Sequence, residues 1–320
     1  MLEKIKRAFV ARYLFDNWYL LLIRFVLAKM GFNVRLRARV SECIFEMDPE
    51  VFARFVSRFS RGLIKSIKCV DGKLFVNDIE ISNISDVIYE TETWARVLGW
   101  KYDTSCNCWV KNNIKLRRMY EVAGTLDIFE EGLYSALNVD GRVVIDVGAF
   151  VGDSAIYFAL KGAKKVIAIE PHPDAFREML NNIKLNNLEN VVVPLNVGLA
   201  SKPGRICIEN VDIKRTAITY HRSGECDVMV PAITLADVVS KYGVNHDAVL
   251  KMDCEGCEFD VILNDYEHVR VFKELLLEYH LYASSEPLSK LLRVLARDYL
   301  CKIIKGSGES IGIMYCLRNR

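Results

Sequence analysis

The chain has 320 residues, of which 51% are hydrophobic and 26% charged, and these proportions exclude an intrinsically disordered or fibrous protein. The formal net charge of +2 is small, but residues 1–40 hold nine Lys and Arg against two acids. A basic amino-terminal arm on a mildly acidic body favours contact with an anionic surface.

The ten cysteines would indicate a disulfide framework in a secreted protein. No cleavable signal is recognised, because Arg12, Asp16 and Arg24 interrupt the apolar residues near the start. We therefore expect a cytoplasmic protein with reduced, buried cysteines. Cys254-Glu-Gly-Cys257 could join Cys106-Asn-Cys108 in a zinc site, but the usual two CxxC pairs are missing, so no metal ligands are assigned.

Residues 1–30 are expected to be helical, with too many charges to span a membrane. Packing on the protein's own body or on a partner subunit is favoured for them over peripheral contact with the inner face of a membrane. Residues 1–40 are assigned as a basic helical arm and residues 41–120 as a small α+β domain. Within this part the sequence patterns predict a half-exposed strand at Val34–Val40, helices at 49–60 and Ser85–Leu98, a hairpin turn at Asp71-Gly72, and a strand at Cys108–Leu116.

Residues 121–320 are organised around a β-branched run that enters Asp146, followed by a turn with Gly148 and Gly152 and a helix that begins near Asp153. A second β-branched run ends in Glu170, which lies 24 residues after Asp146, the length of one strand-helix-strand unit. The two carboxylates are therefore expected side by side at the carboxyl edge of a parallel sheet, where open α/β folds bind ligands.

The turn distinguishes between two ligands. An acid at the second strand end suits the ribose of either a dinucleotide or S-adenosylmethionine. A dinucleotide needs Gly-x-Gly-x-x-Gly so that its pyrophosphate can rest on the helix, but Phe150 replaces the second glycine and Asp153 brings a negative charge. The turn favours S-adenosylmethionine, whose ammonium group is attracted by Asp146 and Asp153.

The remaining patterns complete an alternation of strands and helices. Pro194 within Val191–Val197 indicates an edge strand, and Gly204–Pro231 is expected as an insertion over the ligand edge. Further elements are predicted as helices at Thr234–Tyr242 and Leu288–Ala296 and as strands at Ala248–Met252, Glu274–Tyr279, Tyr299–Ile304 and Ile311–Leu317, the last two joined by a turn at Gly306-Ser-Gly308.

Candidate catalytic residues follow the fourth and fifth strands of this series. Asp253, Glu255 and Glu258 lie within six residues and repel one another, so one of them should have a raised pKa suited to proton abstraction or to holding a cation. Helix capping is the alternative for Asp253 and Glu255. His280, in Glu278-Tyr-His280, is a second candidate base, with a structural role as its alternative.

Four motifs resemble the FkbM-type S-adenosylmethionine-dependent methyltransferases in order and spacing: Asp146-Val-Gly-Ala-Phe-Val-Gly152, Glu170-Pro-His-Pro173, Asn196-Val-Gly198 and Leu250-Lys-Met-Asp-Cys-Glu-Gly-Cys-Glu258. The resemblance implies an α/β fold, a class I Rossmann-like methyltransferase domain with a seven-stranded, mostly parallel sheet, here preceded by the small α+β domain. It also implies that Glu131-Gly-Leu-Tyr134 lies near the cofactor. The expected cofactor-binding residues are Glu131, Tyr134, Asp146, Gly148, Ala149, Gly152, Asp153, Glu170, Pro171, His172, Asn196 and Gly198.

Family members typically methylate hydroxyl groups, so we expect S-adenosyl-L-methionine as cofactor and O-methylation of a hydroxyl on a sugar, a glycan or glycolipid, or a related metabolite. An RNA N-methyltransferase is an alternative, disfavoured because no Asn-Pro-Pro-Tyr-like segment and no RNA-binding module are present. A non-catalytic scaffold that keeps the fold is disfavoured by the intact motif carboxylates.

Overall fold

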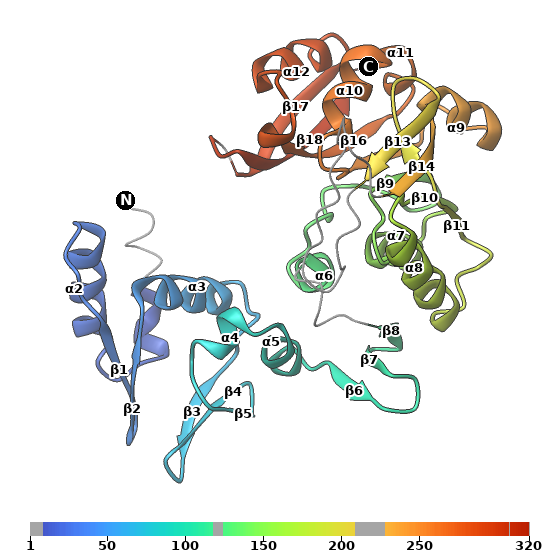
Figure 1. Ribbon diagram of the computed structural model, residues 1–320. Coiled ribbons are helices and arrows are strands. Elements are labelled where there is room, and N and C mark those ends of the chain that lie inside the picture. Colours follow the sequence, from blue (N-terminus) through green and yellow to red (C-terminus); the bar gives the residue numbers. More distant parts are fainter. Residues whose placement is uncertain (1–8, 118–123, 209–227, 307, 320) are drawn as a thin grey trace. The chain divides into compact units, whose positions relative to one another are not determined.

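The computed structural model describes residues 9–117, 124–208, 228–306 and 308–319. The chain divides into two compact units, Met1–Asn112 and Asn113–Arg320 (Figure 1). Within the described ranges, the longest apolar helices fall short of what is needed to cross a bilayer.

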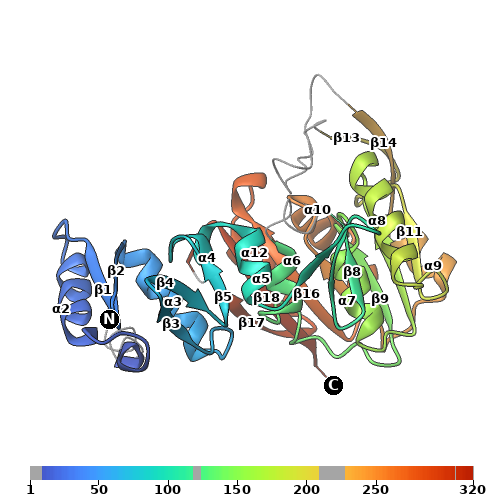
Figure 2. The ribbon, with the colours of Figure 1, turned by 90° about the horizontal axis from the view of Figure 1, so that it is seen from below.

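The first unit combines short helices with antiparallel hairpins. Its elements are η1 (Phe9–Tyr13), α2 (Trp18–Lys29), β1 (Leu36–Val40), β2 (Cys43–Met47), α3 (Pro49–Ser60), β3 (Ile67–Val70), β4 (Lys73–Val76), β5 (Ile79–Ile81), α4 (Asp86–Tyr89), α5 (Thr91–Val97), β6 (Lys101–Asp103) and β7 (Cys108–Lys111). Figures 1 and 2 show α2 beside β1, which pairs with β2. Strand β1 buries every second side chain, as its alternation predicts.

The described part of the basic arm shares a core with the residues that follow it. The Phe15 ring lies 6.3, 6.2 and 6.1 Å from the rings of Phe45, Phe52 and Phe55. Residues 9–40 are thus built into the first unit and do not form a separate arm. The membrane contact expected for residues 1–30 stays a prediction.

The local predictions for this unit are confirmed in part. The Asp71-Gly72 hairpin turn is present, with φ angles of 51° and 72°. The helix predicted over Ser85–Leu98 is two helices, because Glu90 between α4 and α5 is extended. The strand predicted over Cys108–Leu116 is interrupted where Asn112 and Asn113 adopt positive φ angles of 48° and 69°, which asparagine tolerates.

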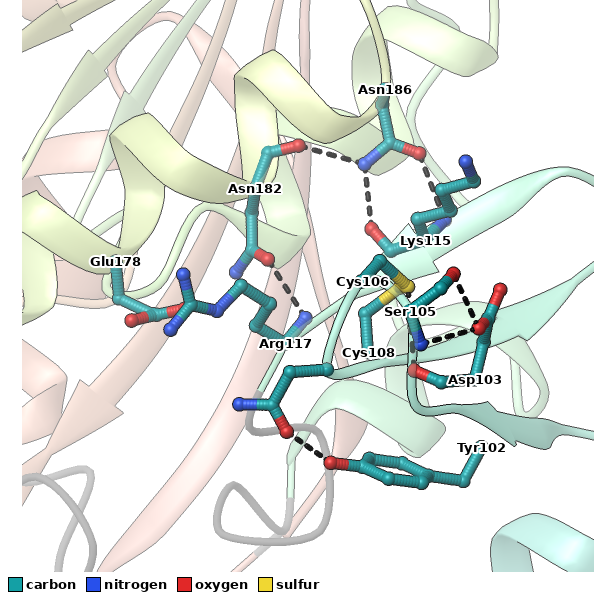
Figure 3. Close-up of a disulfide and its surroundings, with 11 residues drawn as sticks. Tyr102, Asp103, Ser105, Cys106, Cys108, Lys115, Arg117, Glu178, Asn182 and Asn186 are labelled. Carbon is teal, nitrogen blue, oxygen red and sulfur yellow. Dashed lines mark hydrogen bonds and ion pairs between the residues drawn. A yellow bond between two sulfur atoms is a disulfide. The ribbon is translucent and has the colours of Figure 1, made fainter.

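The expectation of reduced cysteines is wrong. Disulfides join Cys43 to Cys69, Cys106 to Cys108 (Figure 3), Cys254 to Cys257 and Cys301 to Cys316; Cys207 is also disulfide-bonded, so none of the cysteines in the described ranges is free. Pairing depends on neighbours brought close by folding, as for Cys301 and Cys316, which face each other on adjacent strands. Disulfides persist mainly in oxidising compartments and in the intracellular proteins of hyperthermophiles.

The second unit contains β8 (Ile114–Leu116), α6 (Gly124–Phe129), β9 (Val143–Val147), α7 (Asp153–Leu160), β10 (Lys165–Ile169), α8 (Pro173–Leu185), β11 (Val192–Leu195), β12 (Gly198–Leu199), β13 (Gly204–Ile208), β14 (Val228–Ile233), α9 (Leu235–Tyr242), β15 (Val249–Met252), α10 (Cys257–Asn264), α11 (Tyr266–Val269), β16 (Glu274–His280), η3 (Leu281–Ala283), α12 (Leu288–Leu295), β17 (Tyr299–Lys305) and β18 (Ile311–Arg318).

Seven of these strands form one sheet in the order β11-β10-β9-β15-β16-β18-β17. Neighbours from β11 to β16 are parallel, and β18 is antiparallel to both β16 and β17. The predicted mostly parallel sheet is confirmed, with β11 as an edge strand. The direction of strand order changes between β9 and β15, which is where such sheets bind ligands.

Alternate residues of the central strands feed two cores, one on each face of the sheet. Val144, Val166 and Val249 pack with residues of α6, α7 and α8. Their neighbours Ile145 and Ile167 pack on the other face with residues of α9 to α12. Each fully buried aliphatic side chain contributes about 1.5–3 kcal/mol. Because both faces are covered, the strand ends are left as the exposed edge at which a site can form.

Asn182 of α8 and Asn186, the residue that caps its end, hold the start of this unit. Asn186 donates to the Lys115 carbonyl at 2.6 Å and accepts from the Lys115 N–H at 2.9 Å, and Asn182 Oδ1 accepts from the Arg117 N–H at 2.8 Å (Figure 3). In the predicted insertion over Gly204–Pro231, the described ends form β13 and β14, which pair antiparallel. Residues 209–227, like Ser307 in the predicted Gly306-Ser-Gly308 turn, lie outside the described residues.

Candidate active site

The turn between β9 and α7 is shaped by close backbone packing. Gly148, Phe150 and Gly152 all have positive φ angles, of 74°, 45° and 86°. A Cβ atom on Gly148 would lie 1.7 Å from the Asp253 carbonyl oxygen, and one on Gly152 would lie 2.8 Å from Met179 Cγ. Both glycines are therefore required by protein packing, which brings the ends of β9 and β15 together.

Asp146 is enclosed and ion-paired. Its Oδ1 lies 3.0 Å from Lys251 Nζ, with both side chains at most 1% exposed, and its Oδ2 accepts from Ser154 Oγ at 2.7 Å. Burial alone would lower the pKa of Lys251, but Asp146 and Asp253 outweigh it and raise that pKa. The structure thus differs from the prediction that Asp146 faces the ligand's ammonium group, because Lys251 already neutralises this carboxylate.

Glu170 follows β10 and lies beside the glycine turn. Its carboxylate accepts the N–H groups of Phe150 at 2.8 Å and His172 at 2.7 Å. Burial raises the pKa of Glu170 to about 7, although both of these hydrogen bonds lower it. Each carboxylate oxygen keeps a further lone pair that can accept a ligand hydroxyl.

A second group of acids surrounds His280 at the ends of β15 and β16. His280 Nε2 lies 3.4 Å from Glu255 Oε2 and 3.9 Å from one oxygen each of Asp253 and Glu278. Burial raises the pKa of Asp253 and Glu255, and it raises that of Glu278 to about 7. Burial would lower the pKa of His280, but Glu258, Glu255 and Asp253 raise it to about 9. The raised pKa expected for at least one of these acids is thus present, but burial is its largest cause and repulsion between the acids a smaller one.

Glu258 has a positioning role in the structure. It is fully buried and accepts the N–H groups of Cys254 at 2.7 Å and Gly256 at 2.9 Å, while Oε1 lies 3.4 Å from His280 Nδ1. Burial would raise its pKa, but His280 and the loop N–H groups lower it overall. The capping considered for Asp253 and Glu255 is not seen, because α10 has no side-chain cap hydrogen bond; Glu258 instead holds the loop before the helix and lies beside His280.

A cavity of about 420 Å³ lies at the carboxyl ends of the central strands. Eight predicted site residues line it, namely Tyr134, Gly148, Asp153, Glu170, Pro171, Gly198, Asp253 and Glu255. The other eight, Glu131, Asp146, Ala149, Gly152, His172, Asn196, Glu258 and His280, are not among its lining residues. Of these, Asn196 donates to the carbonyls of Glu170 and Pro171 at 2.9 and 3.1 Å, so it supports the lining loop from behind.

Sequence reasoning missed several lining residues, including Phe150, Lys251, Glu278, Lys305 and Glu309. Lys251 had a detectable signal, since a charged residue within a short apolar strand at the centre of a parallel sheet has no solvent face and must find a partner. Lys305 lies at the end of β17 and Glu309 in the turn after it. Both reach the cavity only because β17 and β18 join the sheet beside β16, which the sequence alone does not show.

The lining residues fit S-adenosylmethionine better than a phosphate-bearing cofactor. Asp153, Glu170 and Asp253 place carboxyl groups along a cavity whose other walls include the apolar Ile169 and Leu199. The only lysines lining the cavity within the described residues are Lys251, which is paired with Asp146, and Lys305, which lies 3.4 Å from Asp127. Such a donor set attracts an ammonium or sulfonium group and repels a pyrophosphate.

Comparison with known proteins finds a family model that matches part of the chain. Residues 146–299 match the model of the methyltransferase FkbM domain. The chain is 28% identical over 175 residues to the hexuronic acid methyltransferase AglP of Haloferax volcanii, a match that covers 55% of this chain and 70% of that protein. It is 24% identical over 186 residues to the methyltransferase sdnD of Sordaria araneosa, covering 48% and 72%.

Among solved structures, the chain is similar to the methyltransferase FkbM of Methylobacillus flagellatus KT, with 17% identity and a TM-score of 0.43. This match covers 60% of the present chain and 47% of the other, so the chain spans about half the length of that solved protein.

Proposed function

Residues 146–299 belong to the FkbM methyltransferase family, and from this premise we propose that the protein transfers a methyl group from S-adenosylmethionine to a hydroxyl group of a sugar or glycan. Bound in the cavity, S-adenosylmethionine supplies an electrophilic methyl group on its sulfonium. The observation that carries the proposal is that Glu170 and Asp253 line one cavity. Glu170 follows β10 and Asp253 follows β15, the two strands that flank β9.

Glu170 and Asp153 are assigned to the donor. Glu170 is fixed by two N–H groups and is placed to accept hydrogen bonds from ribose hydroxyls with its remaining lone pairs. Asp153, held by Thr125 Oγ1 at 2.6 Å, offers negative charge to the donor's cationic end. Gly148 and Phe150 of the glycine turn line the same cavity.

Asp253 is assigned to the acceptor as its candidate general base. Its carboxyl group lines the cavity, and its raised pKa brings it nearer to that of a base that works at neutral pH. A hydroxyl acceptor needs such a group because it is only weakly acidic. The similarity to a hexuronic acid methyltransferase supports a saccharide as the acceptor class.

The acceptor class is tested with methyl-labelled donor and a panel of hexuronic acids, neutral oligosaccharides and bulk tRNA. We expect label in a saccharide as an alkali-stable methyl ether, because the proposed acceptor is a hydroxyl. Label that alkali releases as methanol would indicate a methyl ester on a carboxylate, and label in tRNA alone would support the RNA alternative. Either result would overturn hydroxyl methylation.

The role of Glu170 predicts a pH-dependent donor affinity. Since the pKa of Glu170 is about 7 and its carboxylate form accepts ribose hydroxyls better, S-adenosylhomocysteine should bind most tightly above pH 7 and weaken as the pH falls to 6. Glu170→Gln should bind more weakly at pH 8 and lose this dependence. Calorimetric titration of both proteins at four pH values is the measurement; parallel pH profiles would remove Glu170 from the ribose site.

A further inference from the structure

The acids at the ends of β15 and β16 have the composition of a cation site. Among the described residues, Asp253, Glu278 and His280 each offer one ligand atom, and these atoms lie within 4.8 Å of one another. Met252 pairs with Leu277 in the parallel register, so Asp253 and Glu278 come next on the two strands, and His280 follows Glu278 on the same face. The sheet itself therefore brings the three side chains together.

The His280 ring gives an independent indication of a ligand. Its side chain is 2% exposed, and Nε2 is surrounded by carboxylate oxygens of Glu255, Asp253 and Glu278 at 3.4, 3.9 and 3.9 Å. These distances exceed the usual length of a nitrogen–oxygen hydrogen bond, about 2.7–3.2 Å. A buried nitrogen is thus aimed at several oxygens in this part of the structure without a close partner among them.

The spacing matches the ligand shell of a small ion. Two ligand atoms that each lie about 2.1 Å from a metal ion at a tetrahedral angle are about 3.4 Å apart, and wider angles give about 3.9 Å. The distances from His280 Nε2 to the proposed ligand oxygens of Asp253 and Glu278 are both 3.9 Å, at the wide end of this range. One ion at the centre could therefore contact all three ligand atoms with small side-chain adjustments.

The support behind His280 also fits a metal ligand. A metal-bound histidine usually directs its other ring nitrogen to a carboxylate, which fixes the ring. His280 Nδ1 lies 3.4 Å from Glu258 Oε1, and Glu258 is anchored by two loop N–H groups. The Glu258 carboxylate thus lies beside Nδ1, and Nε2 lies beside the carboxylates of Asp253 and Glu278.

We propose that Asp253, Glu278 and His280 bind a divalent cation of the first transition row. Two carboxylates and an imidazole suit Mn²⁺ or Zn²⁺ better than Mg²⁺, which prefers oxygen ligands. Asp253 and Glu278 line the cavity, so an ion held by them would be open to it. Resting on the proposed function for this last point, such an ion would lower the pKa of the acceptor hydroxyl, and Asp253 would then serve as a ligand in place of acting as the general base.

The test is a titration of the EDTA-treated, extensively dialysed full chain with Mn²⁺, with free ion measured by electron paramagnetic resonance. We expect one Mn²⁺ per chain, and an affinity lower by about tenfold or more in Glu278→Gln and in His280→Asn. Glu309→Gln is the matched control, because Glu309 lines the same cavity outside the cluster. Its affinity for Mn²⁺ should stay within about twofold of the parent.

Binding of S-adenosylhomocysteine is measured on the same samples. Retained binding in Glu278→Gln shows that the variant is folded, so its loss of Mn²⁺ supports the site. Failure of the parent to bind Mn²⁺ or Zn²⁺, or equal Mn²⁺ binding in parent and variants, would overturn the metal site and leave the proposed methyl transfer standing. A parent that binds Mn²⁺ but no S-adenosylhomocysteine would support the metal site and count against the donor assignment alone.

Discussion

Replacing Asp253 by Asn should lower methyl-transfer turnover by about 10² to 10⁴ while leaving the affinity for S-adenosylhomocysteine close to that of the parent. The reason is that the Asp253 carboxyl group lines the cavity at the end of β15, where it is assigned to the acceptor, whereas the donor is held by residues of β10 and the glycine turn. Single-turnover rates with labelled donor, at saturating acceptor, measure this change directly.

The pH dependence of turnover in the parent is a second test of Asp253 as the general base. In the metal-free protein burial raises the pKa of this carboxyl group, so its basic form increases with pH, and the turnover of EDTA-treated protein should rise and then level as the pH passes that raised pKa. Glu267→Gln, which removes an exposed acid outside the cavity, should keep the parent rate and profile. A turnover in Asp253→Asn within fivefold of the parent would exclude Asp253 as the general base.

The largest stability effect is expected at Lys251. Lys251→Met removes the partner of a carboxylate that is fully buried, and an uncompensated buried charge costs about 3–5 kcal/mol. The Gly148 carbonyl, which accepts from Lys251 Nζ at 2.8 Å, also loses this donor, whereas the Val147 carbonyl loses the lysine at 3.3 Å but keeps the Asp253 N–H at 3.0 Å. Urea denaturation of Lys251→Met should therefore show a free energy of unfolding lower than that of the parent by this amount.

The double variant Asp146→Asn/Lys251→Met is the matched control. It removes both charges, and Asn keeps an acceptor for Ser154 Oγ, so most of the lost stability should return. All four tryptophans lie in the first unit, before Asn113, so tryptophan fluorescence would not report unfolding of the second unit, which holds the pair. The transition should therefore be followed by circular dichroism. A loss below 1 kcal/mol in Lys251→Met, or no recovery in the double variant, would show that the pair is not the buried, mutually dependent one described here.

The strand ends could be predicted from sequence because their signals are local. Apolar runs that end in Asp146 and Glu170, with Gly148 and Gly152 between them, indicate one strand-helix-strand unit whatever the rest of the chain does. The structure confirms that unit in β9, α7 and β10. What local pattern could not show was the partner of each carboxylate, since Asp146 pairs with Lys251 on the next strand and is not among the residues that line the cavity.

The acids after β15 show the same limit from another side. The sequence Asp-Cys-Glu-Gly-Cys-Glu shows that three acids lie close together. Their separate roles depend on His280 of β16, because Glu255 lies beside its Nε2 and Glu258 beside its Nδ1. Glu258 was predicted to be catalytic and instead holds the loop. Cysteine pairing likewise depends on which strands become neighbours, and no spacing in the sequence reveals that Cys301 faces Cys316.

The measurement that tests the account most directly is a calorimetric titration of the full chain with S-adenosylhomocysteine, compared with NAD under the same conditions. A cavity with Asp153, Glu170 and Asp253 on its walls predicts binding of one S-adenosylhomocysteine per chain and no detectable binding of NAD, whose pyrophosphate these acids repel. Binding of NAD without S-adenosylhomocysteine, or of neither, would contradict the assignment of this cavity to a methyl donor.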